Sequence, residues 1–371
     1  MKFTVERSLL LKSLTHIQSV VEKRNTIPVL SNVKLEAINS KLVLKATDME
    51  IEIEETIAAN VLDSGLTTVS AHTLYDIVRK LPDGCEISFD FIADNSSLVV
   101  KAGRSNFSLS CLPAEDFPTI AGEDLGYSFL LDSKDLAALI DKTKFAVSTE
   151  ETRFYLNGIY LHTTEKEDVK VMRSVATDGH RLACMEIDVP KGAESIPGII
   201  IPRKTITEVK KLIDTFVGEI SVSLSENMIK FTFDDVILTS KLIDGNYPDY
   251  EKVIPKDNNI IMDADVAIFA GAVDRVSIVS EKTKGVKLLL KNSTLVISSS
   301  NQEAGSATEE IDVSYNSEAL EIGFNYRYLL DILQEVGQDT VRFAFSDSAS
   351  PTVINNIADT RATYVLMPMR V

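Results

Sequence analysis

The chain has 371 residues, of which 44% are hydrophobic and 25% charged, and its formal net charge is −17. These fractions are typical of a globular protein with two or three domains, and the acidic balance argues against binding nucleic acid over the whole surface. No apolar run reaches about 18 residues, which excludes a membrane-spanning helix. The N-terminal apolar stretch is interrupted by Glu6, Arg7 and Lys12, unlike that of a signal peptide.

The three cysteines, Cys85, Cys111 and Cys184, are scattered and odd in number. They suit reduced thiols better than a disulfide framework, and no CxxC pair indicates zinc. We therefore expect a cytoplasmic protein without a metal or other cofactor.

The first third of the chain predicts a strand, a helix, a run of strands and a second helix. Lys2–Val5 alternates like a strand, and Ser8–Val21 has apolar residues at helical spacing, with Ser8 as the expected N-cap. Ser70–Leu81 is the second expected helix. Short alternating strands are expected between the two helices, at Val33–Ala37, Leu42–Thr47 and Ile51–Ile57.

The same order recurs twice further along the chain. A strand and a helix are expected within Tyr127–Val147, where Ser133 is the expected cap, and more loosely within Ile260–Val279. The strands expected after them are Gly158–His162, Val169–Ala176 and Leu182–Val189, then Val286–Leu290, Thr294–Ser298 and Ala307–Val313.

The second helix of each third carries the clearest repeat. Aligning Asp76, Glu208 and Asp331, which lie 132 and 123 residues apart, superimposes three amphipathic patterns. An apolar residue precedes the acid by two positions, a β-branched one follows it, and another apolar residue comes five positions later, which marks one face of a helix. These residues are Leu74, Ile77 and Leu81, then Ile206, Val209 and Ile213, then Leu329, Ile332 and Val336.

The repeat predicts three α+β domains, at residues 1–124, 125–253 and 254–371. Each has two helices and short alternating strands, which indicate antiparallel sheets with one buried face. Tandem units that meet in the same way can curve and close into a ring, alone or through a symmetric oligomer.

Enzyme motifs are absent from the sequence, since no HExxH, P-loop, GxSxG or GxGxxG occurs. The one suggestive cluster is Asp178 and His180, which would suit either a hydrolase dyad or a turn between strands. Asp48 occupies the matching place in the first repeat, within Ala46-Thr47-Asp48, without a histidine. This favours the turn, although a hydrolase and a monomeric β-rich scaffold remain alternatives.

Basic residues gather on the predicted helices in spite of the acidic total. They form either ordinary solvated faces or one shared surface that tracks phosphates. No set of aromatic residues of the single-strand-binding type accompanies them, so duplex DNA is the better match. These residues are Lys12, Lys23, Arg24, Arg79, Lys80, Lys134, Lys142, Lys144, Arg203, Lys204, Lys210, Lys211 and Arg327.

Several motifs together resemble the bacterial DNA polymerase III beta subunit, the sliding clamp family, from end to end. They are Met1–Arg7, Ala176–Ala183, Ser240–Leu242 with Tyr247–Tyr250, Gly323–Asn325 and Tyr364–Arg370. The resemblance implies three tandem repeats of the DNA-clamp fold in each chain, and a head-to-tail homodimer that closes a six-domain ring around duplex DNA. It also implies a processivity factor that tethers the polymerase and has no catalysis of its own. Such a ring holds DNA by topology and needs only weak phosphate contacts, which accounts for the acidic charge.

The resemblance implies a groove between the second and third domains for short peptide motifs. The partners would be the replicative polymerase alpha subunit, the clamp-loader complex, other polymerases and repair proteins. Lys252 stands where the family often has arginine, and Pro351 where some relatives have a small polar residue. The implied groove residues are Tyr155, Leu156, Thr177, Gly179, His180, Arg181, Leu182, Pro248, Lys252, Val253, Asn325, Tyr328, Val365, Met367, Pro368, Met369 and Arg370.

The resemblance also implies DNA contacts and a subunit interface. His72 and Thr73 fall where relatives can carry two basic residues, so this patch is expected to be weaker here. The interface residues would be Phe107, Ile278 and Val279. The implied DNA-binding residues are Arg24, Arg153, Phe154, Tyr155, Arg203 and Lys204.

Overall fold

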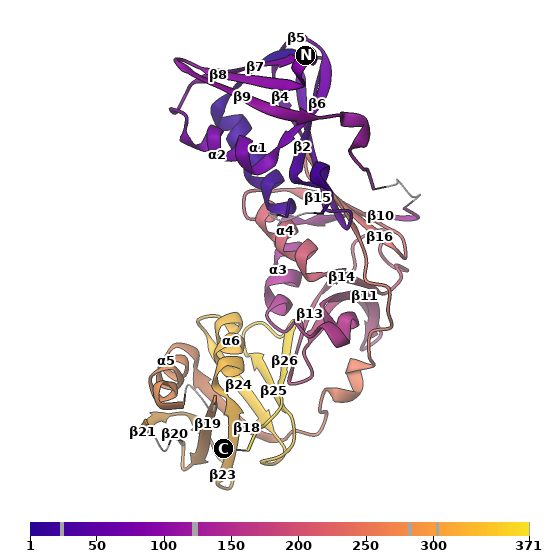
Figure 1. The fold of residues 1–371 in the computed structure, drawn as a ribbon. Helices are drawn as coiled ribbons and strands as arrows, with labels where there is room; N and C mark the ends of the chain where they lie inside the picture. The colour runs from indigo at the N-terminus through magenta and orange to yellow at the C-terminus, as the bar shows by residue number, and fades with distance from the viewer. Residues whose placement is uncertain (23–25, 121–124, 281–283, 302–303, 371) are drawn as a thin grey trace. The chain divides into compact units, whose positions relative to one another are not determined.

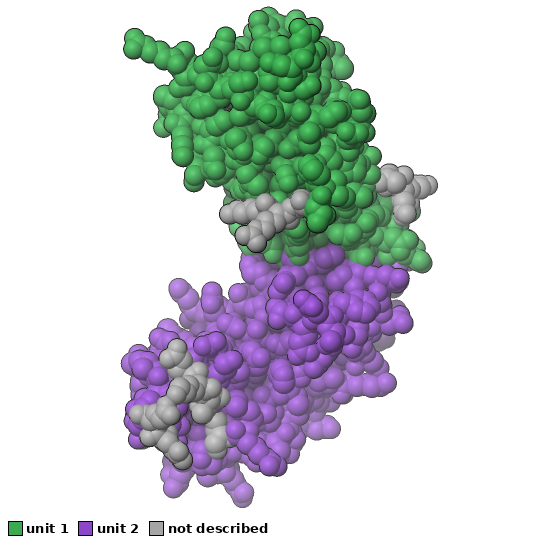
Figure 2. All heavy atoms as spheres, in the orientation of Figure 1, with its two compact units in different colours: residues 1–134, 190–193, 204–242 green, residues 135–189, 194–203, 243–371 purple. Residues whose placement is uncertain are grey.

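The computed structural model describes residues 1–22, 26–120, 125–280, 284–301 and 304–370. They form two compact α+β units (Figure 1 and Figure 2). Unit 1 comprises residues 1–134, 190–193 and 204–242, and unit 2 comprises residues 135–189, 194–203 and 243–371. No helix in the described ranges is both long enough and apolar enough to cross a membrane.

Unit 1 is built on one antiparallel sheet of thirteen strands. Helices α1 (Arg7–Val20) and α2 (Ala71–Lys80) pack side by side against it (Figure 1), and α4 (Arg203–Ile213) belongs to this unit from Lys204 onward. In order across the sheet the strands are β10 (Tyr127–Asp132), β15 (Glu219–Leu224), β16 (Met228–Thr232), β17 (Val236–Lys241), β4 (Ile51–Ala58), β3 (Lys41–Thr47), β2 (Asn32–Ile38), β6 (Gly65–Ser70), β9 (Ser105–Leu112), β8 (Ser97–Ala102), β7 (Glu86–Ile92), β1 (Lys2–Glu6) and β5 (Asn60–Asp63).

Unit 2 contains a nine-stranded sheet and a four-stranded sheet, both antiparallel. Its helices are α3 (Ser133–Lys144, from Asp135 onward), α5 (Val266–Ser277) and α6 (Tyr326–Val336), and α5 packs against α6. The larger sheet runs β14 (Ile199–Pro202), β11 (Gly158–Lys166), β12 (Val169–Thr177), β13 (Arg181–Asp188), β26 (Ala362–Leu366), β25 (Thr352–Asn356), β24 (Thr340–Phe345), β18 (Ile260–Asp265) and β22 (Ser314–Tyr315), and the smaller runs β21 (Gly305–Asp312), β20 (Thr294–Asn301), β19 (Gly285–Lys291) and β23 (Leu320–Asn325).

The predicted threefold α+β repeat is confirmed, and every repeat has a further strand before its second helix that the pattern did not predict. Strands β6, β14 and β23 lead directly into the second helices α2, α4 and α6. The sheets cross from one repeat to the next, because β17 pairs with β4 in unit 1 and β26 pairs with β13 in unit 2. The middle repeat therefore contributes strands to both units, and the boundaries at residues 124 and 253 stay a prediction.

The predicted caps of the first helices are wrong. The residue that caps each of these helices is the acid at the end of the preceding strand. Glu6 accepts a hydrogen bond from the Ser8 N–H (3.1 Å), Asp132 from Lys134 (2.8 Å) and Asp265 from Ile268 (2.9 Å). A carboxylate in this position satisfies an unpaired helix N–H and also meets the positive end of the helix dipole. Ser8 and Ser133 lie inside the helices.

The repeated second helices bury the face that the sequence predicts. Leu74, Ile206 and Leu329 are buried, as are Leu81, Ile213 and Val336, while Ile77 is only half-buried. The shared acid takes part in an ion pair in each repeat. Asp76 pairs with Arg79 (3.0 Å), Glu208 pairs with Lys211 (2.8 Å) and accepts the Ser19 hydroxyl, and Asp331 pairs with Arg181 of β13 (2.5 Å).

Candidate functional site

A groove of about 340 Å³ lies in unit 2 between the η4 helix (Glu151–Leu156), the β12–β13 turn, the η5 helix (Tyr250–Val253) and the end of β26. The Met367 N–H donates to the His180 carbonyl (2.9 Å) and so lays the C-terminal segment along the turn. Ten residues of the predicted groove line it, together with Arg153, Asp249 and Tyr250, and these ten are Tyr155, Leu156, Thr177, Gly179, Arg181, Leu182, Pro248, Val253, Val365 and Met367.

The other predicted groove residues lie outside this lining. Lys252 is exposed and pairs with Asp249 (2.8 Å), while Asn325 caps α6 by accepting from the Arg327 N–H (3.0 Å). His180 and Tyr328 stack on each other with ring centroids 6.2 Å apart. Pro368, Met369 and Arg370 follow the groove along the chain, and the last two line a different cavity.

The turn that borders the groove is held by its own side chains. Thr177 donates its hydroxyl to the Arg181 carbonyl (2.7 Å), and Asp178 accepts the backbone N–H groups of His180 (2.9 Å) and Arg181 (3.1 Å). Thr47 and Asp48 make the same bonds in the β3–β4 turn, where no histidine follows. The interpretation of Asp178 as a turn residue is therefore confirmed, and its carboxylate is occupied by structural bonds.

Arg181 joins three separate parts of unit 2 at one edge of the groove. Its guanidinium pairs with Asp178 (3.1 Å) and with Asp331 of α6 (2.5 Å), and it donates to the Phe145 carbonyl (2.6 Å). The rings of Phe145 and Tyr328 lie 5.1 and 4.3 Å from it. Because its nitrogens are hydrogen-bonded and two aromatic rings lie beside it, Arg181 holds the wall of the groove in place.

The floor of the groove is apolar and aromatic. Tyr160 of β11 stacks on Tyr247 with centroids 4.7 Å apart and ring planes 5° apart. Burial raises the pKa of Tyr247, so its phenol is neutral at physiological pH. The floor belongs to a hydrophobic cluster of Val175, Leu182, Cys184, Tyr250 and Val365, against which Tyr160, Tyr247 and Ile254 pack, and of these Leu182, Tyr250 and Val365 line the groove itself.

Strand register places an equivalent surface in every repeat. Counting starts from the pairs Asn32 with Ser70, Gly158 with Pro202 and Gly285 with Asn325, because the second member of each immediately precedes a second helix. Two residues further along the first strand of each pair, each repeat has one row of side chains that are paired across three neighbouring strands. The side chains of a row lie on the same face of the sheet. The rows are Lys34, Lys45 and Glu54, then Tyr160, Val175 and Cys184, then Lys287, Ser298 and Thr308.

The three equivalent surfaces differ in chemistry. In unit 1 Lys45 pairs with Glu52 (3.2 Å) and Glu54 (2.8 Å), so charged side chains cover the sheet. In the middle repeat Leu182 stands where Glu52 stands in the first, and this surface is the apolar floor of the groove. A groove of this kind is typical of sites that anchor apolar ligand groups.

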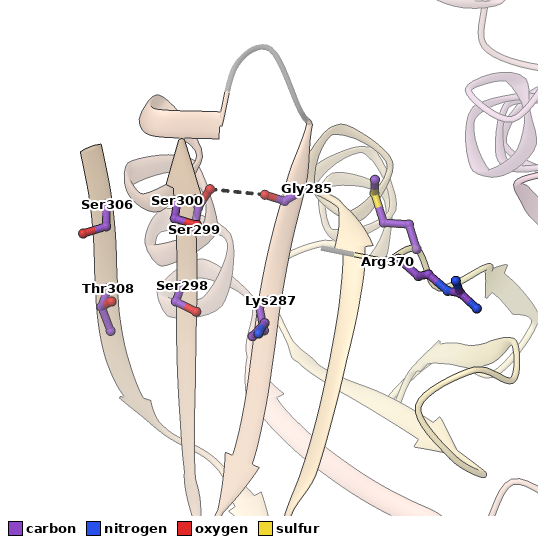
Figure 3. Close-up of a pocket in the computed structure, with 9 residues that line it drawn as sticks. Gly285, Lys287, Ser298, Ser299, Ser300, Ser306, Thr308 and Arg370 are labelled. Carbon is purple, nitrogen blue, oxygen red and sulfur yellow. Dashed lines mark hydrogen bonds between the residues drawn. The ribbon is translucent and has the colours of Figure 1, made fainter. Parts of the chain in front are cut away.

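The third surface is rich in hydroxyl groups. Figure 3 shows Lys287, Ser298 and Thr308 side by side on β19, β20 and β21, in a cavity of about 440 Å³. Arg370 and Met369 of the C-terminal segment complete its lining. The Met369 N–H donates to the Gly323 carbonyl (2.8 Å), so the segment that leaves the groove is fastened to the edge of this second cavity.

His162 of β11 predicts a pH dependence of the stability of unit 2. Burial and the charge of Arg173 lower its pKa from 6.5 to about 4, so the unfolded chain binds this proton more readily than the folded chain. We expect the stabilisation to be complete above about pH 6.5 and to be lost progressively as the pH falls toward 4. Urea unfolding midpoints at pH 7.0, 5.5 and 4.5 should fall more steeply for the wild type than for His162→Gln. His180→Gln is the control, since it retains His162, and equal slopes in all three proteins would contradict the assignment.

The structure places the predicted DNA-binding residues on two elements. Arg153, Phe154 and Tyr155 lie on η4, and Arg203 and Lys204 begin α4. Arg24 lies outside the described residues. Arg153 pairs with Glu150 (3.0 Å), Phe154 is 53% exposed, and Lys204 pairs with Asp48 and Glu22.

Other basic side chains of the helices pair with acids of their own helix or of its C-terminal end. These pairs are Arg79 with Asp76, Lys144 with Asp141, Lys210 with Asp214 and Lys211 with Glu208. The positive charge of the helices is therefore partly neutralised within each unit, and phosphate contacts from them would be weak.

The predicted interface residues lie at strand edges that lack a partner in the described parts of the chain. Phe107 lies on β9, whose residues 105–110 pair only with β8. Ile278 and Val279 lie on η6 (Ile278–Ser280), which packs on β20 and β21, and β21 is the outermost strand of its sheet. Ile278 is 76% exposed, which is unusual for an isoleucine and marks an apolar surface.

Comparison with known proteins matches the chain over its full length. The DNA polymerase III beta subunit family matches through its N-terminal domain at residues 1–121, its central domain at 130–249 and its C-terminal domain at 251–370. The beta sliding clamp of Caulobacter vibrioides is 48% identical over 372 residues, and that of Escherichia coli is 38% identical over 374, each with 100% of both chains covered.

Solved structures agree with this match. A crystal structure of the Caulobacter crescentus beta sliding clamp has a TM-score of 0.98 at 48% identity, covering 100% of this chain and 99% of that one. The sliding clamp of Bartonella birtlesii, bound to griselimycin, has a TM-score of 0.97 at 45% identity and covers 100% of both chains. The chain therefore belongs to the family of the bacterial DNA polymerase III beta subunit, the beta sliding clamp.

Proposed function

We propose that this chain is the DNA sliding clamp of a replicative polymerase, a non-catalytic processivity factor that acts in the cytoplasm. Two copies close head to tail into a ring around duplex DNA. The ring tethers the polymerase alpha subunit, the clamp-loader complex, other polymerases and repair proteins, whose short peptide motifs bind the groove of unit 2.

The observation that carries the proposal is an imbalance in strand pairing. In each repeat three consecutive strands follow the first helix. In the first and middle repeats the third of these strands pairs with the last strand of the next repeat, β4 with β17 and β13 with β26. In the described residues the third such strand, β21, pairs with β20 on one side only, and its outer edge is unpaired, as is the outer edge of β9 over residues 105–110. Unpaired edges favour association, and a second copy supplies β9 to β21 and β21 to β9. This contact is heterologous, and it gives a ring when it closes after two copies.

The exposed apolar side chains support the same contact. Phe107 lies on one of the two unpaired edges and Ile278 with Val279 beside the other. Pairing the edges would bring these side chains together and bury them, which is the usual composition of a stable subunit interface.

The helices suit weak contact with DNA. The ion pairs described above and a net charge of −17 argue against a uniformly basic surface. Each phosphate that a protein neutralises adds salt-dependent affinity, so few available charges allow the ring to move along the duplex. Arg153, Phe154, Tyr155, Arg203, Lys204 and Arg24 are proposed as the residues that approach DNA.

The groove suits a peptide with apolar anchors. Its floor combines aliphatic and aromatic side chains, and its volume of about 340 Å³ is that of a small-ligand site. A related clamp from Bartonella birtlesii binds griselimycin. We propose that this chain binds griselimycin in the same groove, in competition with partner peptides.

Retention on circular DNA tests the ring directly. The protein, loaded by a clamp-loader complex onto a nicked circular plasmid, should stay with the plasmid through gel filtration at about 0.2 M salt, where weak phosphate contacts no longer hold it. Cutting the plasmid once should release it, since a ring slides off a free end. Equal retention on circular and linear plasmid would overturn the proposal.

A further inference from the structure

Beside the floor of the groove, on the same face of the sheet, lies a buried arginine that does not line the groove. Arg173 of β12 is 8% exposed. Its guanidinium donates to Glu186 of β13 (2.9 Å), to the Tyr250 hydroxyl (2.7 Å) and to Glu251 (2.8 Å). Two of these partners are consecutive residues of η5, so one side chain fastens η5 to the sheet.

Two hydrogen bonds in sequence link Arg173 to the Tyr250 hydroxyl and the Tyr250 hydroxyl to His162. Arginine can only donate, so the Tyr250 hydroxyl accepts from Arg173 and keeps its own proton for another acceptor. That acceptor is Nε2 of His162, 2.9 Å away. The low pKa of His162 keeps its imidazole neutral at neutral pH, so Nε2 accepts in the tautomer that carries its proton on Nδ1, and burial raises the pKa of Tyr250 so that its phenol keeps the proton. Tyr250 is therefore held at its hydroxyl by β12 and β11 together.

The other repeats show that the fold does not require an arginine here. In the middle repeat Arg173 pairs across the strands with Glu186. The equivalent pairs are Val43 with Thr56 in the first repeat and Val296 with Glu310 in the third, so a valine stands in place of Arg173 in both. A buried charge is costly unless it is fully paired, and a valine at this place closes the same sheet without that cost. The arginine occurs only in the repeat whose surface forms the apolar groove.

We propose that Arg173 is a positioning residue for partner binding, which holds Tyr250 and η5 in place so that the groove exists before a peptide arrives. This inference rests on the proposed function, in which the groove binds partner peptides. Residues of the η5 segment, from Pro248 to Val253, form one wall of the groove, and Tyr250 forms part of its floor. A wall that is already ordered spares the peptide the entropy cost of ordering it, which strengthens binding and slows dissociation.

The repeats supply the test variant. Arg173→Val with Glu186→Thr rebuilds the Val43–Thr56 pair of the first repeat, so it removes the buried arginine together with its carboxylate partner. Lys166, which also pairs with Glu186 (2.6 Å), is half-exposed and can return to solvent. A fluorescein-labelled peptide from the clamp-binding segment of the replicative polymerase alpha subunit is the probe. We expect about tenfold weaker binding, mostly from faster dissociation, while sedimentation velocity still reports a dimer. Amide exchange at residues 247–254 should quicken while that of β12 and β13 stays slow.

Coupling to Tyr250 separates positioning from general destabilisation. Tyr250→Phe keeps the aromatic side chain but loses its hydroxyl. Adding it to the Arg173→Val, Glu186→Thr variant should weaken binding no further, since both changes break the same hydrogen bond between Arg173 and Tyr250. Arg342→Val is the matched control, because Arg342 makes a two-bond ion pair with Asp263 in the same unit, away from the groove.

Three outcomes would overturn the inference. Unchanged peptide affinity in the folded Arg173→Val, Glu186→Thr variant would do so, as would a further full loss on adding Tyr250→Phe. An equal loss in Arg342→Val would show that any lost ion pair weakens the site. A wild-type protein that fails to bind the peptide would instead overturn the proposed function of the groove, and this inference with it.

Discussion

Deletion of residues 367–371 should lower the affinity for partner peptides at least tenfold while the ring still assembles. Strand β26 ends at Leu366, which pairs with Arg181, so the closing strand of the sheet is complete without the deleted segment. Met367 lines the groove, and burying a methionine side chain against a ligand is worth roughly 1.5–3 kcal/mol, or about tenfold to a hundredfold in Kd. Fluorescence anisotropy with the labelled alpha-subunit peptide measures the loss, and circular dichroism checks the fold.

The first repeat provides a matched control for this deletion. The Lys241 N–H donates to the Glu50 carbonyl (2.9 Å) as the Met367 N–H donates to that of His180 (2.9 Å), so the two residues occupy equivalent places. Met367→Ala should lose most of the affinity that the deletion loses, and Lys241→Ala should lose none. If a folded truncated protein keeps its peptide affinity, the groove has been assigned to the wrong surface.

Ile278→Asp should convert the dimer into a monomer. The proposed ring buries this side chain at both of its interfaces, and an uncompensated buried charge costs roughly 3–5 kcal/mol at each, which raises the dimer Kd by about ten-thousandfold or more. Sedimentation velocity should then report 40.9 kDa in place of about twice that mass. Loss of the ring should also abolish retention on circular DNA.

Val217→Asp is the control for the interface. Val217 is 89% exposed and precedes β15, which is far from β9 in the strand order of the unit 1 sheet, so the same change there should leave the dimer intact. A dimer that persists in Ile278→Asp at nanomolar concentration would place the interface elsewhere, and a wild-type monomer would favour the scaffold alternative.

Local periodicity accounts for the elements that were predicted well. The stripe through Leu74, Ile206 and Leu329 depends on helical spacing alone, and all three side chains are buried. The strands expected after the first helix of each repeat all occur, because the alternation of apolar and polar residues is likewise a local signal. Strands β6 and β14 were missed because they are short and lead straight into a helix. The acidic caps were missed because Ser8 and Ser133 match the usual cap preference one or two residues later.

The groove was predicted through family resemblance, and its supporting residues were not. Tyr250 belongs to the motif Tyr247–Tyr250 that carried the resemblance, yet only the structure places its ring in the floor. Arg173 gave no signal, since a single arginine in an alternating strand reads as an outward-facing charge. The bond between Arg181 and Asp331 joins residues 150 positions apart, which no local pattern can reveal.

By itself the sequence determined the threefold repeat, the α+β composition and the turn at Asp178, because each depends on neighbours along the chain. Only the tertiary structure decided which of three equivalent surfaces becomes a groove. Lys45, Val175 and Ser298 hold the same place in the repeat, and each strand alternates in the same way. A surface acquires its chemistry when strands pair, because pairing brings side chains of neighbouring strands together. In the first repeat it brings Glu52 and Glu54 to Lys45. In the middle repeat it brings Leu182, Cys184 and Val365 to Val175. Pairing across strands, both within a hairpin and with Val365 from the last strand of the chain, therefore determined the site.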